Sequence, residues 1–373
     1  MAVLVLDNGA SSAKVGYNTS ENPRLIPNCI FKAKSERRKL FIGDQLEECK
    51  DYSGLFYVMP FQKGFLVDFP ETTVLVTEPQ FNFSSIKDAM DEILFEEYNF
   101  KAICRSTAAQ LSAYKSHNDE SEKRIMCLVV DSGYSFTHIV PVFNGKVLKK
   151  GVKRINVGGK LLTNHLKEII SYRQLHVLDE TYVINQVKED TCYVSDNFFR
   201  DMQFAKLRGA KNTVVRDYVL PDYTHIKRGY VKSATEMLLG SKKENEQVCV
   251  HDYCIFFFNV FVVGIQEMGI PEAISHAINE LPTEMQPHCY MNILLTGGSS
   301  LFPGMKERVF SEVRRLAPFD VDVAVHCPSR PITHAWEGGA ALSKTDVFLN
   351  KMCVTKAEYE DNGKNICREK FDS

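Results

Sequence analysis

The sequence predicts an α/β protein built from two similar lobes. Apolar runs typical of strands alternate with amphipathic stretches over the whole length. The 373 residues exceed what one hydrophobic core usually organises, so two domains or one large bilobed molecule are expected. A strand, an Asp-x-Gly turn and a second strand occur at residue 7 and again at residue 131. Their separation is about the length of one domain, which favours an internal duplication.

Charge and cysteine content narrow the classes of function. The chain has 45 Lys and Arg against 47 Asp and Glu, so its net charge favours neither nucleic acid nor a membrane surface. Its 11 cysteines are odd in number and lack the spacing of metal or redox motifs, which predicts reduced thiols in an intracellular protein. The start of the chain lacks a secretory pattern, and the apolar stretch 254–263 is too short to cross a bilayer. We therefore expect a soluble protein.

The first predicted element is a strand that ends in Asp7-Asn8-Gly9 and is followed by Lys14. Inward-facing backbone amides of such a turn can cradle a phosphate, and Gly lets the backbone approach it. A carboxylate at Asp7, like the one at Asp131, would repel a phosphate unless a hydrated Mg²⁺ or Ca²⁺ lay between them. Each turn alone is an ordinary turn sequence, and only its repetition in matched strand contexts favours the phosphate interpretation.

The clearest predicted helix spans 84–98. An apolar stripe runs along it, with a Ser at the N-cap and acidic residues on the other face. The stripe consists of Ile86, Ala89, Met90, Ile93 and Leu94, and we expect it to pack in the core. After the next apolar segment, the acidic stretch 116–123 predicts an exposed connection between the two halves.

A third Gly-rich element, LLTGGSSLFPG at 294–304, follows a predicted strand and precedes a predicted helix. Such an element can present backbone groups and the ring of Phe302 to a flat nucleobase. Two basic clusters, 32–39 and 149–154, are open to two interpretations. They are either solvated loops, or contacts for DNA or histones, the first also resembling a nuclear import signal.

Several motifs together resemble the actin family. They are DNGASSAKVGY, DSGYSFTHIVPVF, VGGKLLTNHL, VKEDTCYV, LLTGGSSLFPG, HAWEGGAAL and VTKAEYEDNGKNICREKF, in this order. The resemblance implies the bilobed fold that actin shares with sugar kinases and chaperone ATPases, with duplicated mixed-sheet domains around a nucleotide cleft. The first lobe would comprise 1–123 and 334–373, with a small insert at about 29–59. The second would comprise 124–333, with an insert at about 158–263.

The resemblance also implies a nucleotide site, holding ATP or ADP with Mg²⁺ or Ca²⁺. Asp7, Gly9 and Lys14 would form one phosphate loop, and Asp131 and Gly133 the other, with both carboxylates holding the metal through water. His138 would lie near the attacking water. The ribose and adenine would be met by Gly159, Lys188, Glu189, Gly297, Gly298, Ser299 and Phe302.

Other stretches resemble a nuclear subfamily of actin-related proteins. These are LIPNCIFK, SGLFYVMPFQKGFLV, TEPQFNFSSIKDAMDEILFEEYNF, GIQEMGIPEAI and LPTEMQPH. The resemblance implies a nuclear protein, in part cytoplasmic, that is a subunit of Swr- or SRCAP-type chromatin remodelling complexes, which exchange a histone variant. Its partners would be the remodeller ATPase and accessory subunits, with histones or nucleosomes as further candidates.

Five residues around the implied nucleotide site depart from the actin pattern. Ala108 stands where actin has the Gln that orients water, Tyr134-Ser135 replaces Asp-Gly, Ala10 replaces a hydroxyl residue, and Ile332 replaces a Lys. Because phosphoryl transfer depends on positioning, these changes predict slow or no ATP hydrolysis. We expect a scaffold that binds nucleotide without acting as an enzyme. The alternative is an ATP-hydrolysing actin-like polymeriser or cytoskeletal protein, and a small-molecule kinase is less consistent because no catalytic base stands out.

Two further departures concern structure. The family continues after GFLV with a Trp-bearing helix, whereas only six residues, 68–73, separate Val67 from the next apolar run here. A whole helix is missing, so the first lobe has repacked around a shorter connection or folds poorly. The apolar stretch 254–263 replaces a turn of the family and is interpreted as buried core, with a partner contact or an aggregation site as the alternative.

Overall fold

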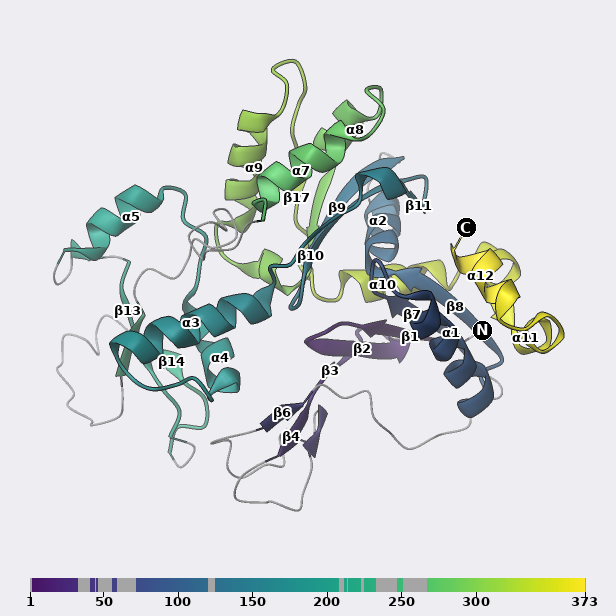
Figure 1. The fold of residues 1–373 in the computed structure, drawn as a ribbon, viewed down its shortest axis with the longest axis horizontal. Coiled ribbons are helices and arrows are strands. Elements are labelled where there is room, and N and C mark those ends of the chain that lie inside the picture. The colour runs from purple at the N-terminus through teal and green to yellow at the C-terminus, as the bar shows by residue number, and fades with distance from the viewer. Residues whose placement is uncertain are drawn as a thin grey trace.

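The computed structural model describes residues 2–32, 41–43, 45, 56–58, 72–119, 125–207, 211–212, 214–222, 225–232, 247–250 and 267–372. Within them the chain forms two large mixed sheets with packed helices and two small sheets at the periphery (Figure 1). This confirms the predicted α/β class. Both ends of the chain lie on the same side of the molecule (Figure 1). Among the described residues, no helix is long and apolar enough to cross a membrane.

The first-lobe sheet has the strand order β18-β8-β7-β1-β2-β3. Its strands are β1 (Val3–Asn8), β2 (Ser12–Tyr17), β3 (Arg24–Pro27), β7 (Thr73–Glu78), β8 (Ala102–Thr107) and β18 (Val354–Thr355). Strands β1, β7 and β8 run parallel, whereas β1, β2 and β3 form an antiparallel meander. The late strand β18 pairs with β8, so the end of the chain returns to the first lobe.

The second-lobe sheet has the order β11-β10-β9-β16-β17, with β12 paired to β10. Its strands are β9 (Met126–Ser132), β10 (Thr137–Phe143), β11 (Lys146–Val147), β12 (Lys153–Ile155), β16 (Ile293–Thr296) and β17 (Val325–His326). Hairpin β9–β10 with its parallel neighbour β16 repeats the arrangement of hairpin β1–β2 with β7. The predicted repetition of the strand-turn-strand unit is therefore confirmed.

The remaining elements cover the sheets or extend from them. The helices are α1 (Ser84–Glu92), α2 (Ala108–Asp119), α3 (Gly159–Arg173), α4 (Thr181–Thr191), α5 (Phe198–Ala205), α7 (Ile270–Asn279), α8 (Gln286–Tyr290), α9 (Met305–Leu316), α10 (His334–Leu342), α11 (Lys356–Asn362) and α12 (Lys364–Asp372). Shorter turns are η2 (Ile93–Glu97), η3 (Lys149–Gly151), η6 (Gly298–Leu301) and η7 (Phe348–Met352). The small sheets contain β4 (Ile30–Lys32), β5 (Phe41–Ile42) and β6 (Phe56–Val58), and β13 (Arg216–Val219), β14 (Tyr230–Val231) and β15 (Gln247–Val250).

Successive side chains of β1 point to opposite faces of the first-lobe sheet, and both faces are packed. Val5 belongs to a cluster with Leu111 of α2 and Trp336 of α10, and the Trp336 indole donates a hydrogen bond to the Val5 carbonyl oxygen at 3.1 Å. Leu4 points the other way and packs with the cluster that contains Phe95 of η2. The two faces of this sheet are therefore covered by different helices.

Helix α2 lies between the two large sheets and packs on both. Leu111 joins the first-lobe cluster, whereas Ala109 and Ala113 pack with Val129 and Val140 of the second-lobe sheet. The helix extends to Asp119, so the predicted connection at 116–123 begins later than expected. Helix α2 thus connects the cores of the two lobes.

The helix predicted at 84–98 is present, but its orientation is not the predicted one. It begins at Ser84 after Phe83, which makes no side-chain cap, and continues as the π-helical turn η2. Met90 and Leu94 of the predicted stripe face the core, whereas Ile86, Ala89 and Ile93 are exposed. The expectation that the whole stripe is core was wrong, because buried polar contacts on the other side of the helix set its orientation.

Several expectations lie outside the described residues. They concern most of the basic cluster 32–39, the short connection after Val67 up to residue 71, and the apolar stretch 254–263. The eight cysteines whose side chains the structure describes are free thiols, as their spacing predicted.

Candidate functional site

The first predicted loop is the turn between β1 and β2. Asp7 and Lys14 are opposite each other in the hairpin register, and their side chains form an ion pair of 3.2 Å. The other oxygen of Asp7, Oδ1, accepts a hydrogen bond of 2.9 Å from the Thr77 hydroxyl at the end of β7. A Cβ at Gly9 would lie only 2.8 Å from the Ser12 carbonyl oxygen, so the backbone of the turn leaves no room for a side chain there. The structure thus fixes the Asp7 carboxylate from both sides.

The second predicted loop joins β9 to β10 and receives the start of α3. The Gly133 amide donates to the Phe136 carbonyl oxygen at 3.0 Å, which closes the turn. The amides of Gly159 and Lys160 donate to the carbonyl oxygens of Gly133 and Tyr134 at 3.0 and 2.8 Å. The loop therefore satisfies donors of the first turn of α3 that would otherwise lack an intrahelical acceptor.

The carboxylates of the two loops act on each other across the lobes. Burial and the nearby charge of Asp7 together raise the pKa of Asp131 to about 6, while the Lys14 ammonium opposes the rise. Two acidic groups in this relation fit a divalent cation with water ligands, because the cation would remove the repulsion. Neither at these loops nor at any other place among the described residues do three or more His, Cys, Asp or Glu side chains gather to bind a metal directly. The residues present therefore fit the cation that the sequence predicted.

The third Gly-rich element meets the second loop at the edge of the sheet. Strand β16 runs parallel to β9 with Thr296 opposite Asp131, so Gly297 follows directly beside the loop. Gly297 has a φ of 85°, and a Cβ there would lie 2.8 Å from Asp131 Oδ1. A Cβ on Gly298 would meet no atom within 4 Å, so the backbone at Gly298 borders open space. The two Gly residues let the chain turn beside the carboxylate while leaving room in front of it.

The residues predicted for the ribose and adenine differ in whether their polar groups are available to a ligand. Lys188 is buried, and its ammonium donates to Gly159 O, Thr163 Oγ1 and Asn185 Oδ1 at 3.2, 3.0 and 2.8 Å. Burial lowers the pKa of Lys188. Its three hydrogen bonds fasten α4 to α3 and leave its ammonium without a donor for a ligand.

Three other predicted residues complete this set. The exposed Glu189 accepts a hydrogen bond of 2.6 Å from Asn185 Nδ2. Ser299 is buried in η6, and Phe302 packs against the hydrophobic clusters of α9 and of α3. Their contacts with a nucleotide stay predictions.

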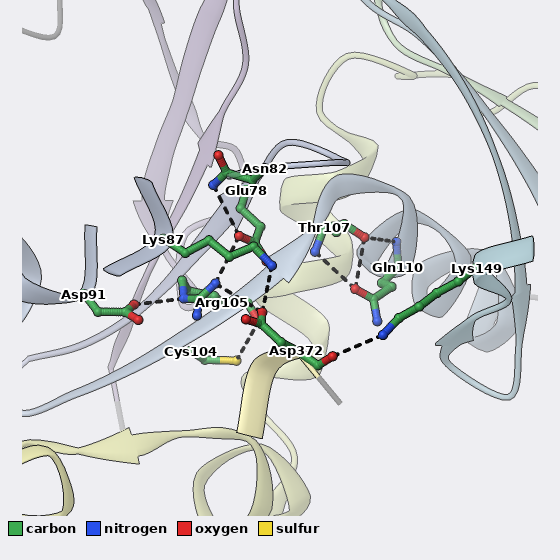
Figure 2. Close-up of polar contacts among 10 residues, drawn as sticks. All are labelled: Glu78, Asn82, Lys87, Asp91, Cys104, Arg105, Thr107, Gln110, Lys149 and Asp372. Carbon is green, nitrogen blue, oxygen red and sulfur yellow. Dashed lines mark hydrogen bonds and ion pairs between the residues drawn. The ribbon is translucent and has the colours of Figure 1, made fainter. Parts of the chain in front are cut away.

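The residues around the predicted water position are also defined. Gln110 does not reach into the site, because its Oε1 accepts from the Thr107 amide and hydroxyl at 3.2 and 3.0 Å (Figure 2). Its Nε2 donates to the Gly145 carbonyl oxygen of the second lobe at 3.3 Å. Ala108 at the start of α2 has no polar side-chain group that could replace it. Burial lowers the pKa of His138 to about 4, with Arg154 adding to the effect, so this imidazole is neutral at pH 7.

Thr77 is the site residue that sequence reasoning missed. Its buried hydroxyl accepts from the Asn8 amide at 2.8 Å while it donates to Asp7. A polar β-branched residue at the end of a strand parallel to β1 was the available signal, because parallel strands bring their carboxyl ends to one edge.

The basic cluster 149–154 is largely used within the protein. Lys153 forms an ion pair with Glu280 at 2.5 Å, and Arg154 lies over the Phe136 ring at 4.8 Å. Lys149 donates to the Asp372 carbonyl oxygen at 3.2 Å (Figure 2). These contacts favour a structural role for most of the cluster over DNA or histone binding.

Sequence comparisons with known proteins find relatives that match nearly the whole chain. The family model described as Actin matches residues 67–372. Actin-related protein 6 of Drosophila melanogaster is 40% identical over 394 aligned residues, covering 97% of this chain and 98% of that protein. Actin-related protein 6 of Oryza sativa subsp. indica is 34% identical, with 99% and 98% covered. The protein of the same name from Arabidopsis thaliana is 32% identical, with 99% of both covered.

These similarities extend through both hairpins, the Gly-rich element and the C-terminal helices, rather than being confined to the loops. The chain therefore belongs to the actin family.

Proposed function

We propose that this protein is a nuclear scaffold subunit of a Swr- or SRCAP-type chromatin remodelling complex and supports exchange of a histone variant. It holds ATP or ADP with Mg²⁺ or Ca²⁺ as a structural ligand and hydrolyses it slowly or not at all. Its partners are the remodeller ATPase and accessory subunits. The similarity to proteins named actin-related protein 6 along nearly the whole chain supports this proposal.

The observation that carries the proposal is the contrast between two parts of the site. The groups suited to hold a cation and phosphates are arranged in both loops, with Asp7 fixed by Lys14 and Thr77 and facing Asp131. The position that would orient the attacking water holds the apolar Ala108, and the Gln110 amide is committed to Thr107 and Gly145. A site of this composition favours binding over turnover.

The chain's own residues would divide the work of holding the ligand. Asp7 and Asp131 would bind metal-held water, and Lys14 would add a positive charge beside the phosphates. The space in front of Gly298 would admit the adenosine side. A bound nucleotide with its cation would stabilise the folded state, because the unfolded chain lacks the site.

The proposal is tested by purifying the tagged protein from nuclear extract and identifying the bound proteins by mass spectrometry. We expect a remodeller ATPase together with histone-exchange subunits. The Asp131→Asn variant should recover less of the complex, because loss of the structural ligand weakens the folded scaffold. Recovery of chaperones alone would contradict the proposal and would indicate that the shortened first lobe does not fold into a functional subunit.

A single-turnover measurement with Mg-ATP distinguishes the proposed scaffold from the alternative, an ATP-hydrolysing polymeriser. We expect no phosphate release on the time scale of an actin control, and Ala108→Gln should increase the rate. An actin-like rate in the unaltered protein would instead support the polymeriser.

A further inference from the structure

Helix α1 presents an apolar surface to solvent. Ile86 and Ile93 are seven residues apart, which places them on one side of the helix, and Ala89 between them is also exposed. Phe83, just before the first turn, is 73% exposed. An amphipathic helix of a folded domain normally turns this side to the core.

The orientation is set by polar contacts on the opposite side. Asp91 is 0% exposed and forms an ion pair of 2.8 Å with Arg105 of β8 (Figure 2). Asp88 accepts a hydrogen bond of 3.0 Å from Arg368 Nε, and Glu92 pairs with Lys364 at 2.7 Å, so α12 occupies this side. Turning the apolar side inward would leave the buried Arg105 without its partner. The exposed stripe is therefore a fixed feature of the fold.

The preceding loop adds to the same surface at a conformational cost. Phe81 has a φ of 61° and is 57% exposed. A bulky side chain in the left-handed region is strained, in contrast to the Asn residues that occupy it elsewhere among the described positions. Strain of this kind occurs where neighbouring contacts or function hold the backbone. The left-handed backbone conformation of Phe81 directs its ring to solvent, near the exposed ring of Phe83.

The adjoining sheet is also incompletely covered. Leu4 and Leu6 of β1 point to the sheet face on which Met90 packs, but both are only half-buried. Their partners in the β1–β2 register are Tyr17 and Val15, of which Tyr17 is exposed. Residues directly opposite in a hairpin share a face.

The charges around the stripe indicate what could cover it. Glu96 and Glu97 are exposed at the end of η2, and no basic residue lies in the last turn of that element. Carboxylates at the negative end of the helix dipole are unfavourable and would be relieved by a cation. A covering element with basic residues beside its apolar contacts would therefore be complementary.

We propose that the face formed by Phe81, Phe83, Ile86 and Ile93 docks an amphipathic helix of a partner protein that carries basic residues beside its apolar stripe. This inference rests on the proposed scaffold function and identifies one surface that serves it. The contact is a helix lying along α1, anchored by aromatic and aliphatic side chains and oriented by Glu97 and its neighbours.

The test uses two fluorescein-labelled model helices and the full-length protein. One peptide has Leu on one side and Lys on the other, and the second has Glu in place of Lys. Fluorescence anisotropy should show tighter binding of the Leu/Lys peptide, weakened at least about tenfold by Ile86→Ser with Ile93→Ser. Phe319→Ser, at an exposed Phe of the second lobe, is the matched control and should leave binding unchanged.

Each other outcome overturns the proposal. Equal binding by the double variant would mean that the stripe is not the docking face, and equal binding of both peptides would exclude the charge complementarity. Self-association in sedimentation equilibrium that the double variant abolishes would assign the face to a second copy. Protection of Phe83 and Ile86 from hydroxyl radicals in the free protein would mean that its own chain covers them. The peptide readout is independent of the nuclear purification, so failure of the scaffold function remains distinguishable.

Discussion

At the scale of single residues, the two loop carboxylates have different surroundings although they occupy equivalent places in the duplicated unit. Asp7 has a protein partner on each oxygen, Lys14 on one and Thr77 on the other. Burial and the charge of Asp7 raise the pKa of Asp131 to about 6. In the protein without a cation, ionised Asp131 is therefore the more costly group.

We predict that Asp131→Asn stabilises the cation-free protein at pH 7.5. The folded pKa of Asp131 is raised from 3.8 to about 6, so its ionisation lowers the free energy of unfolding as the pH rises through that window. Removing the charge should recover up to about 3 kcal/mol above pH 6 and little at pH 4. Thermal unfolding in EDTA at both pH values measures this, with the exposed Asp346→Asn as control. An unchanged or lower stability at pH 7.5 would contradict the energetic cost assigned to ionised Asp131.

Thr77 should control cation affinity without contacting the cation. Thr77→Val keeps the shape of the side chain but removes the hydrogen bond to Asp7 Oδ1, so Mn²⁺ should bind about fivefold to tenfold more weakly. Thr77→Ser keeps the hydroxyl and should restore affinity to within about twofold. Electron paramagnetic resonance of free Mn²⁺ gives both constants. Equal affinity in the valine variant would leave Thr77 with a purely structural role.

At the scale of elements, the Arg105 cluster holds β7, β8, α1 and α12 together. Arg105 pairs with Glu78 at 3.0 Å as well as with Asp91, and its guanidinium lies over the Phe371 ring at 4.9 Å. Lys87 reaches Asp372 at 2.7 Å (Figure 2). Burial raises the pKa of Asp91 to about 6, and Arg105 opposes that rise.

Removing Arg105 should therefore destabilise the first lobe strongly. Arg105→Ala leaves Asp91 buried without a counter-charge and should cost about 3–5 kcal/mol. Arg368→Ala, which removes a surface pair with Asp88, should lower the stability far less, because solvent screens that pair. Urea unfolding monitored through the single Trp336, which lies in the first-lobe core, compares the two variants. Similar losses in both would mean that the buried cluster contributes no more than a surface pair.

At the scale of the whole molecule, contacts between the lobes run through α2 and the chain end. Gln110 donates to Gly145, and Lys149 donates to the carbonyl oxygen of Asp372 in the last turn of α12. Apolar side chains of α2 pack on both large sheets. The end of the chain is thus fastened to both lobes.

A protein of this kind should remain unassembled in conditions that polymerise actin. After incubation with Mg-ATP and ultracentrifugation, we expect it in the supernatant while an actin control pellets. The reason is that lengthwise assembly needs complementary end surfaces, which the proposed scaffold role does not require. Pelleting that depends on ATP would favour the polymeriser.

Much of the fold and part of the site could be predicted from the sequence alone. Strand periodicity and Asp-x-Gly turns are local signals, so both hairpins and the element at 294–304 were placed correctly. The ordered set of motifs also gave the family. These features depend on residues close together in the chain, which determine their own turns and strands.

Only the tertiary structure decided which side of α1 is buried and what fixes Asp7. The pattern predicted that the apolar stripe of α1 faces the core, but the contacts of Asp91 with Arg105 and of the helix with α12, which begins at Lys364, bury the other side. The hydrogen bonds from Thr77 to Asp7 and from Gln110 to Gly145 likewise join strands and loops that meet only after folding. The physical reason is that a buried charge must find its partner wherever the chain provides one, and this requirement outweighs a local apolar stripe.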